Sequence, residues 1–119
     1  MALRSLIVDD NESFLEAARS RLDQDGLRVD GLAATSADAL TQAAASHPDV
    51  VLVDIFLGSE SGLELARRLV AEGHPVILIS TYAEADVADL IAGIPALGFL
   101  QKSELSAETI RRIVNGRPD

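Results

Sequence analysis

Short aliphatic runs alternate with segments of helical periodicity along the chain, and this alternation restricts the fold more than any other feature of the sequence. The helical segments repeat apolar residues every three or four positions, as Phe14, Leu15, Ala18 and Leu22 do. The expected strands cover residues 6–8, 27–33, 50–53, 76–79 and 98–101. Strands that alternate with helices build a parallel sheet between two helical layers. The sequence therefore predicts a single α/β domain.

Capping residues mark where several of the expected helices begin. Ser36 is a candidate N-cap for the second helix, and Ser61 and Glu64 have the spacing of a capping box at the start of the third. Ser106 begins the last helix. In the second expected strand, residues 27–33, charged side chains interrupt the apolar pattern, so we expect this strand toward an edge of the sheet.

Composition excludes several classes of protein. The chain has 119 residues, 48% of them hydrophobic, which suits one domain over residues 1–114, followed by a polar tail or the start of a linker at 115–119. Cysteine is absent, which excludes disulfides and thiolate metal sites and suits a cytoplasmic protein. The sequence shows neither a targeting segment nor an apolar stretch long enough for a membrane span. A net charge of −9 argues against direct binding to nucleic acid.

Polar side chains stand where the expected strands end. Parallel strands place these ends along one edge of the sheet, which is where open α/β sheets bind ligands. The residues concerned are Asp9 and Asp10 after the first strand, Asp54 after the third, Ser80 and Thr81 after the fourth, and Lys102 after the fifth. We therefore expect three carboxylates, two hydroxyls and one amine to meet at this edge.

Three clustered carboxylates require a compensating cation, because two of them about 4 Å apart repel by roughly 4 kcal/mol at an effective dielectric constant near 20. Lys102 supplies one positive charge, so a hard divalent ion is expected as well. Mg²⁺ fits best, since it binds through a few carboxylates and keeps positions for water and phosphate. The metal and Lys102 would neutralise phosphoryl oxygens, Ser80 would hydrogen-bond another, and Asp54 would act as the nucleophile.

Taken singly, each of these residues has a structural explanation. Asp9 and Asp10 could cap the following helix, Asp54 could be satisfied by backbone donors, and Lys102 could be a solvated surface charge. Ser80 alone could be an ordinary hydroxyl at a strand end. Their joint position at one edge of the sheet favours a functional site.

Two other protein classes use related chemistry and are disfavoured. A phosphatase of the haloacid dehalogenase type needs a second aspartate two residues after its nucleophile, where this chain has Phe56. A flavodoxin needs a phosphate loop rich in Ser, Thr and Gly after the first strand, where this chain has the acidic segment DDNESF. His47 and His74 precede prolines at strand entrances, on the opposite edge of the sheet, so we interpret both as turn residues.

Four segments of the chain resemble the receiver domain of bacterial two-component response regulators. They are LIVDDNESF, VVLVDIFLGSESGLELA, VILIST and GFLQKSEL, which occur in the family's order and cover essentially the whole chain. The resemblance implies a flavodoxin-like (βα)5 three-layer sandwich with strand order 2-1-3-4-5, in which the first strand lies beside the third. The segment KSEL is most similar to NarL/LuxR-type regulators, whose output is a helix-turn-helix DNA-binding domain.

The resemblance also implies a role for each residue at the edge of the sheet. Asp54 matches the phosphoacceptor, and Lys102 matches the lysine that pairs with the phosphate. Asp9 and Asp10 match the acidic pair that holds Mg²⁺ together with Asp54, and the backbone carbonyl of Phe56 matches a further metal ligand. A sensor histidine kinase would supply the phosphoryl group. Because the domain modifies itself, we do not class it as a conventional enzyme.

A conformational switch follows from the same resemblance. Ser80 matches the switch hydroxyl and Phe99 the aromatic residue that changes rotamer on activation. The surface of the fourth helix, fifth strand and fifth helix would then change by a population shift. We expect the output to be homodimerisation or release of an attached domain that controls transcription.

Three positions near Asp54 depart from the family pattern. Gly58 stands where proline is usual, Phe56 where polar residues are common, and Thr81 where Ala or Gly is usual. Phe56 and Tyr82 flank the path of an attacking water, so we expect slow loss of the phosphoryl group. These departures keep open one alternative, a receiver that acts without phosphorylation as a protein–protein interaction module.

Overall fold

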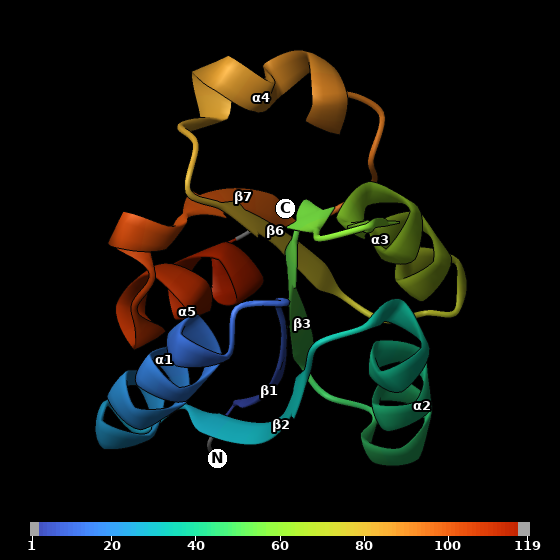
Figure 1. The fold of residues 1–119 in the computed structure, drawn as a ribbon. Coiled ribbons are helices and arrows are strands. Elements are labelled where there is room, and N and C mark those ends of the chain that lie inside the picture. The colour runs from blue at the N-terminus through green and yellow to red at the C-terminus, as the bar shows by residue number, and fades with distance from the viewer. Residues whose placement is uncertain (1–2, 117–119) are drawn as a thin grey trace.

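The computed structural model describes residues 3–116 and contains a central sheet of five parallel strands (Figure 1). Their order across the sheet is β2-β1-β3-β6-β7, which corresponds to the expected order 2-1-3-4-5 and confirms the flavodoxin-like α/β sandwich. The strands are β1 (Arg4–Val8), β2 (Arg28–Ala33), β3 (Val50–Asp54), β6 (Val76–Ser80) and β7 (Gly98–Gln101).

In the described part of the chain, five α-helices cover the two faces of the sheet. They are α1 (Glu12–Gln24), α2 (Ser36–Ser46), α3 (Gly62–Ala71), α4 (Glu84–Ile91) and α5 (Ala107–Asn115). In Figure 1, α1 and α5 lie on one face and α2 and α3 on the other, and the buried side chains form two separate clusters accordingly. In β1, Ile7 belongs to the cluster of α1 and α5, whereas Leu6 and Val8 belong to the cluster of α2, α3 and α4, because successive side chains of a strand point to opposite faces.

The central strands β3 and β6 are buried along their whole length. A parallel strand that is covered on both faces has an almost continuous apolar sequence, which is the pattern that predicted these two strands. β2 lies at one edge of the sheet, as expected. Its carboxylate at Asp30 pairs with Arg28 at 2.6 Å and with Arg4 of β1 at 3.0 Å, so the charges within this strand compensate one another.

The helix caps agree only in part with the sequence-based expectation. The N-cap of α2 is Thr35 rather than Ser36: Thr35 has an extended backbone and accepts a first-turn N–H at 3.2 Å, whereas Ser36 is already helical. Ser and Thr both cap helices well, so composition did not separate them. Ser61 caps α3 as predicted, accepting the N–H of Glu64 at 3.2 Å, but the Glu64 carboxylate pairs with Arg67. Ser106 caps α5.

Two short elements were not expected from the sequence. One is an antiparallel hairpin formed by β4 (Phe56–Leu57) and β5 (Glu60–Ser61), directly after Asp54. The other is a 3-10 turn, η1 (Lys102–Glu104), between β7 and α5.

The C-terminal helix reaches one residue into the segment expected to be a tail. α5 continues to Asn115, with Gly116 as its C-cap. The last three residues of the expected tail, 117–119, lie outside the described residues. Within residues 3–116, every helix is too short or too polar to cross a membrane.

Candidate functional site

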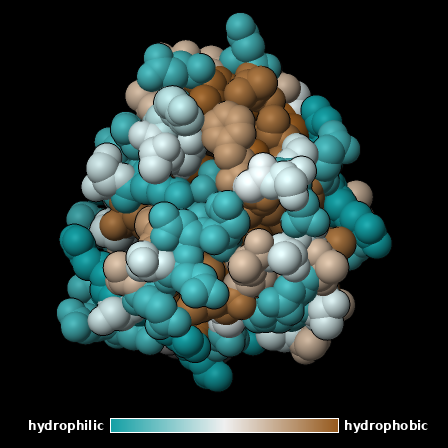
Figure 2. Space-filling view, viewed as in Figure 1, coloured by the Kyte–Doolittle hydropathy of each residue, from teal (hydrophilic) through white to brown (hydrophobic). Residues whose placement is uncertain are grey.

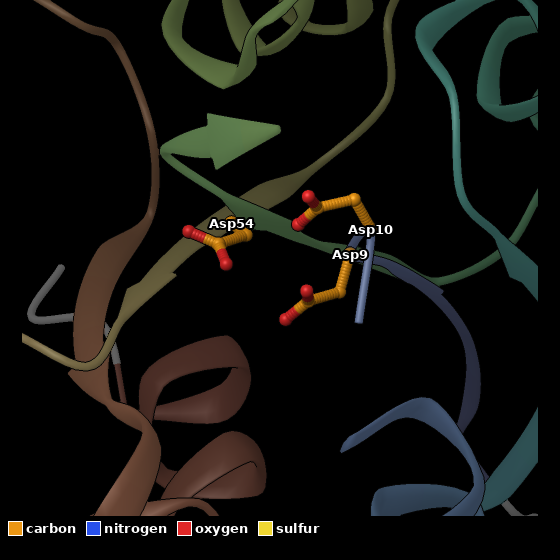
Figure 3. A group of neighbouring side chains, drawn as sticks. All are labelled: Asp9, Asp10 and Asp54. Atoms are coloured by element: carbon orange, nitrogen blue, oxygen red, sulfur yellow. The ribbon is translucent and has the colours of Figure 1, made fainter. Parts of the chain in front are cut away.

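Three aspartates meet at the edge of the sheet where β1 and β3 end. Val8 of β1 pairs with Val53 of β3, so the next residue of each strand, Asp9 and Asp54, also lie side by side. Asp10 follows directly, and its carboxylate points toward Asp54 (Figure 3). One carboxylate oxygen from each of the three lies within 4.8 Å of the others. The structure therefore confirms the prediction that these three carboxylates converge at one edge of the sheet.

Burial differs among the three carboxylates. Asp9 is fully buried and Asp54 is 6% exposed, whereas Asp10 lies at the surface. One oxygen of each buried carboxylate accepts a local backbone N–H: Asp9 Oδ1 from Asn11 at 2.9 Å, and Asp54 Oδ1 from Phe56 at 3.0 Å. These bonds fix the orientation of both side chains and leave the second oxygen of each for another partner.

Lys102, the only lysine in the sequence, supplies that partner. It lies in η1, and its Nζ is 2.5 Å from Asp9 Oδ2 and 2.8 Å from Asp54 Oδ2. The side chain is 13% exposed, and its ammonium lies 4.3 Å from the centre of the Phe14 ring, a cation–π contact that the sequence did not indicate. A single ammonium thus bridges the two buried carboxylates.

The electrostatic surroundings shift two pKa values upward. Burial raises the pKa of Asp9, and the Asp54 charge adds to this, although Lys102 and the Asn11 N–H act in the opposite direction. Burial lowers the pKa of Lys102, but hydrogen bonds to Asp54 and Asp9 outweigh it, so the pKa is raised overall. The lysine therefore stays charged at neutral pH, while the buried Asp9 carboxylate is incompletely compensated.

This donor set suits a hard divalent cation. Three carboxylates face one ammonium, which leaves two negative charges in excess. Among the described residues, the one partner of the buried Asp9 Oδ2 is the Lys102 ammonium, which Asp54 shares. Carboxylate and carbonyl oxygens are the ligands that Mg²⁺ uses in proteins. Asp9, Asp10 and Asp54 therefore have the chemistry of a Mg²⁺ site, and the part of the Phe56 carbonyl in it stays a prediction.

The predicted switch residues lie on the neighbouring strands. Ser80 ends β6, one residue after Ile79, which pairs with Asp54 in the ladder. Its side chain is buried, and its Oγ accepts the N–H of Tyr82 at 3.1 Å. Phe99 lies in β7 and packs, half-buried, against the cluster of α2, α3 and α4. The structure thus places Ser80 at the same edge as Asp54 and Phe99 farther along the sheet.

The surface around the site divides by polarity. In Figure 2, hydrophilic residues fill the middle of the face, and hydrophobic residues gather above them, in the direction of α4 in Figure 1. Phe56 and Tyr82 are exposed by 46% and 54% and contact each other edge to face, with ring centroids 5.9 Å apart. This aromatic pair joins the β4–β5 hairpin to the segment that follows β6.

Gly62 is a residue whose importance the sequence did not reveal. A Cβ at this position would lie 1.8 Å from the backbone oxygen of Asp54, so α3 begins directly against the end of β3. The Gly62 N–H also bonds to the carbonyl of Ile55 at 3.2 Å. A glycine after a capping serine looks like an ordinary helix start, and only the tertiary contact shows why a side chain is excluded here.

The two histidines lie away from this site, as predicted. His47 is the C-cap of α2, with φ of 47°, and His74 directly precedes Pro75 and β6. Their ring centroids are 6.1 Å apart. Both residues therefore stand where strands begin, on the edge of the sheet opposite the aspartates.

Comparison with known proteins defines the family. The family model of the response regulator receiver domain matches residues 5–115. The response regulator MprA of Mycobacterium tuberculosis strain H37Rv is 31% identical over 96 residues, which are 81% of this chain and 41% of that relative. This chain belongs to the response regulator receiver domain family. It spans well under half the length of the MprA proteins that it matches.

Solved structures support the same fold. The receiver domain of the NarL response regulator from Mycobacterium tuberculosis has 27% identity and a TM-score of 0.83, with 98% of both chains covered. A response regulator from Burkholderia pseudomallei, described with a phosphorylated aspartic acid, a calcium ion and citrate, has 27% identity and a TM-score of 0.79 over 95% of this chain and 66% of that one. A LuxR-family regulator from Aurantimonas has 22% identity and a TM-score of 0.86 over 98% of this chain and 88% of that one, which supports the fold alone.

Proposed function

We propose that this domain accepts a phosphoryl group on Asp54 from a phosphohistidine of a sensor histidine kinase, in the presence of Mg²⁺. The observation that carries the proposal is the cluster of three carboxylates whose buried members share the Lys102 ammonium. A structural ion pair would need one carboxylate for one lysine. Three carboxylates at one ligand-binding edge of an α/β sheet instead suit a cation and an anion bound together.

The chemistry assigns one task to each side chain. Asp54 Oδ2 attacks phosphorus, a P–O bond forms and the P–N bond of the phosphohistidine breaks, and the electron pair returns to the imidazole nitrogen. The Phe56 N–H holds the other Asp54 oxygen and so orients the attacking one. Lys102, already 2.8 Å from Asp54, pairs with the phosphoryl oxygens as they arrive. Because the domain modifies only itself, we regard it as a phosphoacceptor rather than a conventional enzyme.

The Mg²⁺ ligands would be Asp9, Asp10, Asp54 and the Phe56 carbonyl. When bound, the ion supplies neutralisation of the negative charge on the transferring phosphoryl group. Held by these residues, the ion would also offset the excess negative charge of the three carboxylates. The Burkholderia pseudomallei regulator, described with a phosphorylated aspartic acid and a calcium ion, supports this assignment by similarity.

The proposed output is a change of surface. Ser80 moves its hydroxyl to a phosphoryl oxygen and gives up the Tyr82 N–H, and Phe99 turns inward with it. We further propose that the domain is of the NarL/LuxR type, in keeping with its similarity to the NarL receiver, and acts in the cytoplasm through homodimerisation or an attached helix-turn-helix domain that controls transcription. The net charge of −9 supports an indirect route to DNA.

Incubation with acetyl phosphate and Mg²⁺, followed by intact-protein mass spectrometry, tests the proposal. We expect the mass of one added phosphoryl group in the wild-type protein, none after removal of Mg²⁺ with EDTA, and none in Asp54→Asn. Modification that persists in Asp54→Asn would move the phosphoacceptor elsewhere. If no modification occurs with acetyl phosphate, and beryllofluoride with Mg²⁺ leaves the NMR spectrum unchanged, the domain acts without phosphorylation.

A further inference from the structure

The hairpin of β4 and β5 is too short to hold its own shape. It contains two residue pairs, Phe56 with Ser61 and Leu57 with Glu60, and even much longer isolated hairpins are only marginally stable in water. Its tip carries Gly58 with φ of 61°. The conformation of this segment therefore depends on contacts with the rest of the molecule.

On one side, the hairpin contacts the candidate metal and phosphoryl site. Phe56 donates its N–H to Asp54 Oδ1 at 3.0 Å. A Cβ at Gly58 would lie 3.0 Å from Asp10 Oδ2, so the turn of the hairpin lies against that carboxylate. Leu57, which is 3% exposed, anchors the hairpin in the core. Any shift of the hairpin would therefore move its backbone relative to two of the three aspartates.

On the other side, the hairpin contacts the beginning of α2. Glu60 Oε1 accepts the backbone N–H of Ser36 at 2.9 Å, across 24 residues of sequence. The Thr35 side chain satisfies an N–H later in the first turn, so Glu60 satisfies one that the cap leaves free. A carboxylate at this position also interacts favourably with the positive end of the helix.

We infer that Glu60 is a positioning residue: its bond to α2 holds the β4–β5 hairpin in the conformation that sets the Phe56 carbonyl and the Asp10 carboxylate for Mg²⁺. The inference rests on the proposed function for the identity of the metal. The bond ties the site to a helix that carries neither Lys102 nor any of the three aspartates of the site, and so makes the affinity for the ion depend on the start of α2.

Two variants remove this bond from opposite sides. Glu60→Ala removes the acceptor. Ser36→Pro removes the donor at the first helical position, where proline is well tolerated, and the preceding Thr35 has φ of −133° and ψ of 160°, a conformation compatible with a following proline. Glu60→Gln keeps an acceptor oxygen without the charge. Glu64→Ala, which removes an equally charged and exposed side chain of α3 paired only locally with Arg67, is the matched control.

Mg²⁺ titrations followed by NMR, with no phosphodonor present, provide the main measurement. We expect the dissociation constant for Mg²⁺ to rise about two- to fivefold in Glu60→Ala and in Ser36→Pro, the effect of losing one exposed charge-assisted hydrogen bond at a helix start. Glu60→Gln should recover part of this loss. The dissociation constant of the double variant for Mg²⁺ should not exceed that of the more affected single variant, because each change removes the same bond.

Amide hydrogen exchange in metal-free protein gives a second, independent measurement. The amides of Phe56 and Gly62 should exchange faster in Glu60→Ala and in Ser36→Pro than in Glu64→Ala. Equal effects of Glu60→Ala and Glu64→Ala on Mg²⁺ affinity would show a general charge effect and overturn the inference. Unchanged exchange in both variants would overturn it as well. Both measurements are made without phosphoryl transfer, so a failure of the proposed reaction would not be confused with a failure of this inference.

Discussion

Replacement of Gly62 by alanine is the strictest test of how the candidate site is built. The added Cβ would lie 1.8 Å from the backbone oxygen of Asp54, about 1.6 Å short of an ordinary van der Waals contact. Neither the Asp54 backbone nor α3 can move away without a large loss of stability. Asp54 is paired with Ile79 in the central sheet, and Leu65 and Leu69 anchor α3 in the core. Overpacking usually costs about 1–3 kcal/mol, and for a clash with backbone we expect about 3 kcal/mol or more. That is a large part of the roughly 5–15 kcal/mol by which domains are stable.

Urea unfolding followed by circular dichroism measures this cost, and Gly73→Ala is the control. Gly73 has φ of 92°, and within residues 3–116 no atom beyond its chain neighbours would lie within 4 Å of an added Cβ, so alanine there incurs only the left-handed strain of about 1–2 kcal/mol. If Gly62→Ala lowers the free energy of unfolding by no more than Gly73→Ala does, the close approach of α3 to Asp54 is not a real constraint. Gly62→Ala should also slow phosphorylation by acetyl phosphate, since the clash displaces the backbone that carries Asp54.

Two further predictions concern the charge of Asp9 and the access of water to a phosphoryl group on Asp54. Asp9→Asn should raise the free energy of unfolding of metal-free protein at pH 7, because burial and the Asp54 charge raise the pKa of Asp9 and make its ionisation unfavourable in the fold. A pKa raised by folding costs stability as the pH rises through it, so the advantage of the variant in urea titrations should grow with pH and vanish below about pH 4; a constant advantage would contradict this reasoning. The phosphorylated protein should lose its phosphoryl group over minutes or longer, because we expect the Phe56 and Tyr82 rings, whose centroids are 5.9 Å apart, to flank the path of water to Asp54. Intact mass after removal of the donor measures the rate, Tyr82→Ala should increase it, and loss from the wild-type protein within seconds would refute the prediction.

The sequence was sufficient for the architecture because burial on both faces leaves a strong pattern. The aliphatic runs of β3 and β6 and the polar residues that follow them predicted both the parallel sheet and its ligand-binding edge. The pairing of Val8 with Val53 then brings Asp9 beside Asp54, which the strand order implied by the resemblance anticipates. The roles of these residues in phosphoryl transfer remain predictions.

What the sequence could not supply depends on contacts between distant segments. The strands of the β4–β5 hairpin have two residues each, too few to show a period, and depend on the buried Leu57 and on Gly58. The 3-10 turn η1 carries Lys102 toward the aspartates, whereas the sequence showed only that a lysine follows a strand. The bond from Ser36 to Glu60 joins residues that look like separate helix starts.

The presence of one lysine has a practical consequence. A lysine-specific endoprotease has a single cleavage point in this sequence, after Lys102. That side chain is 13% exposed and held by two carboxylates, so cutting requires η1 to come away from its neighbours. The rate of digestion at one bond thus reports the free energy of local opening at this place, without a label or an engineered probe.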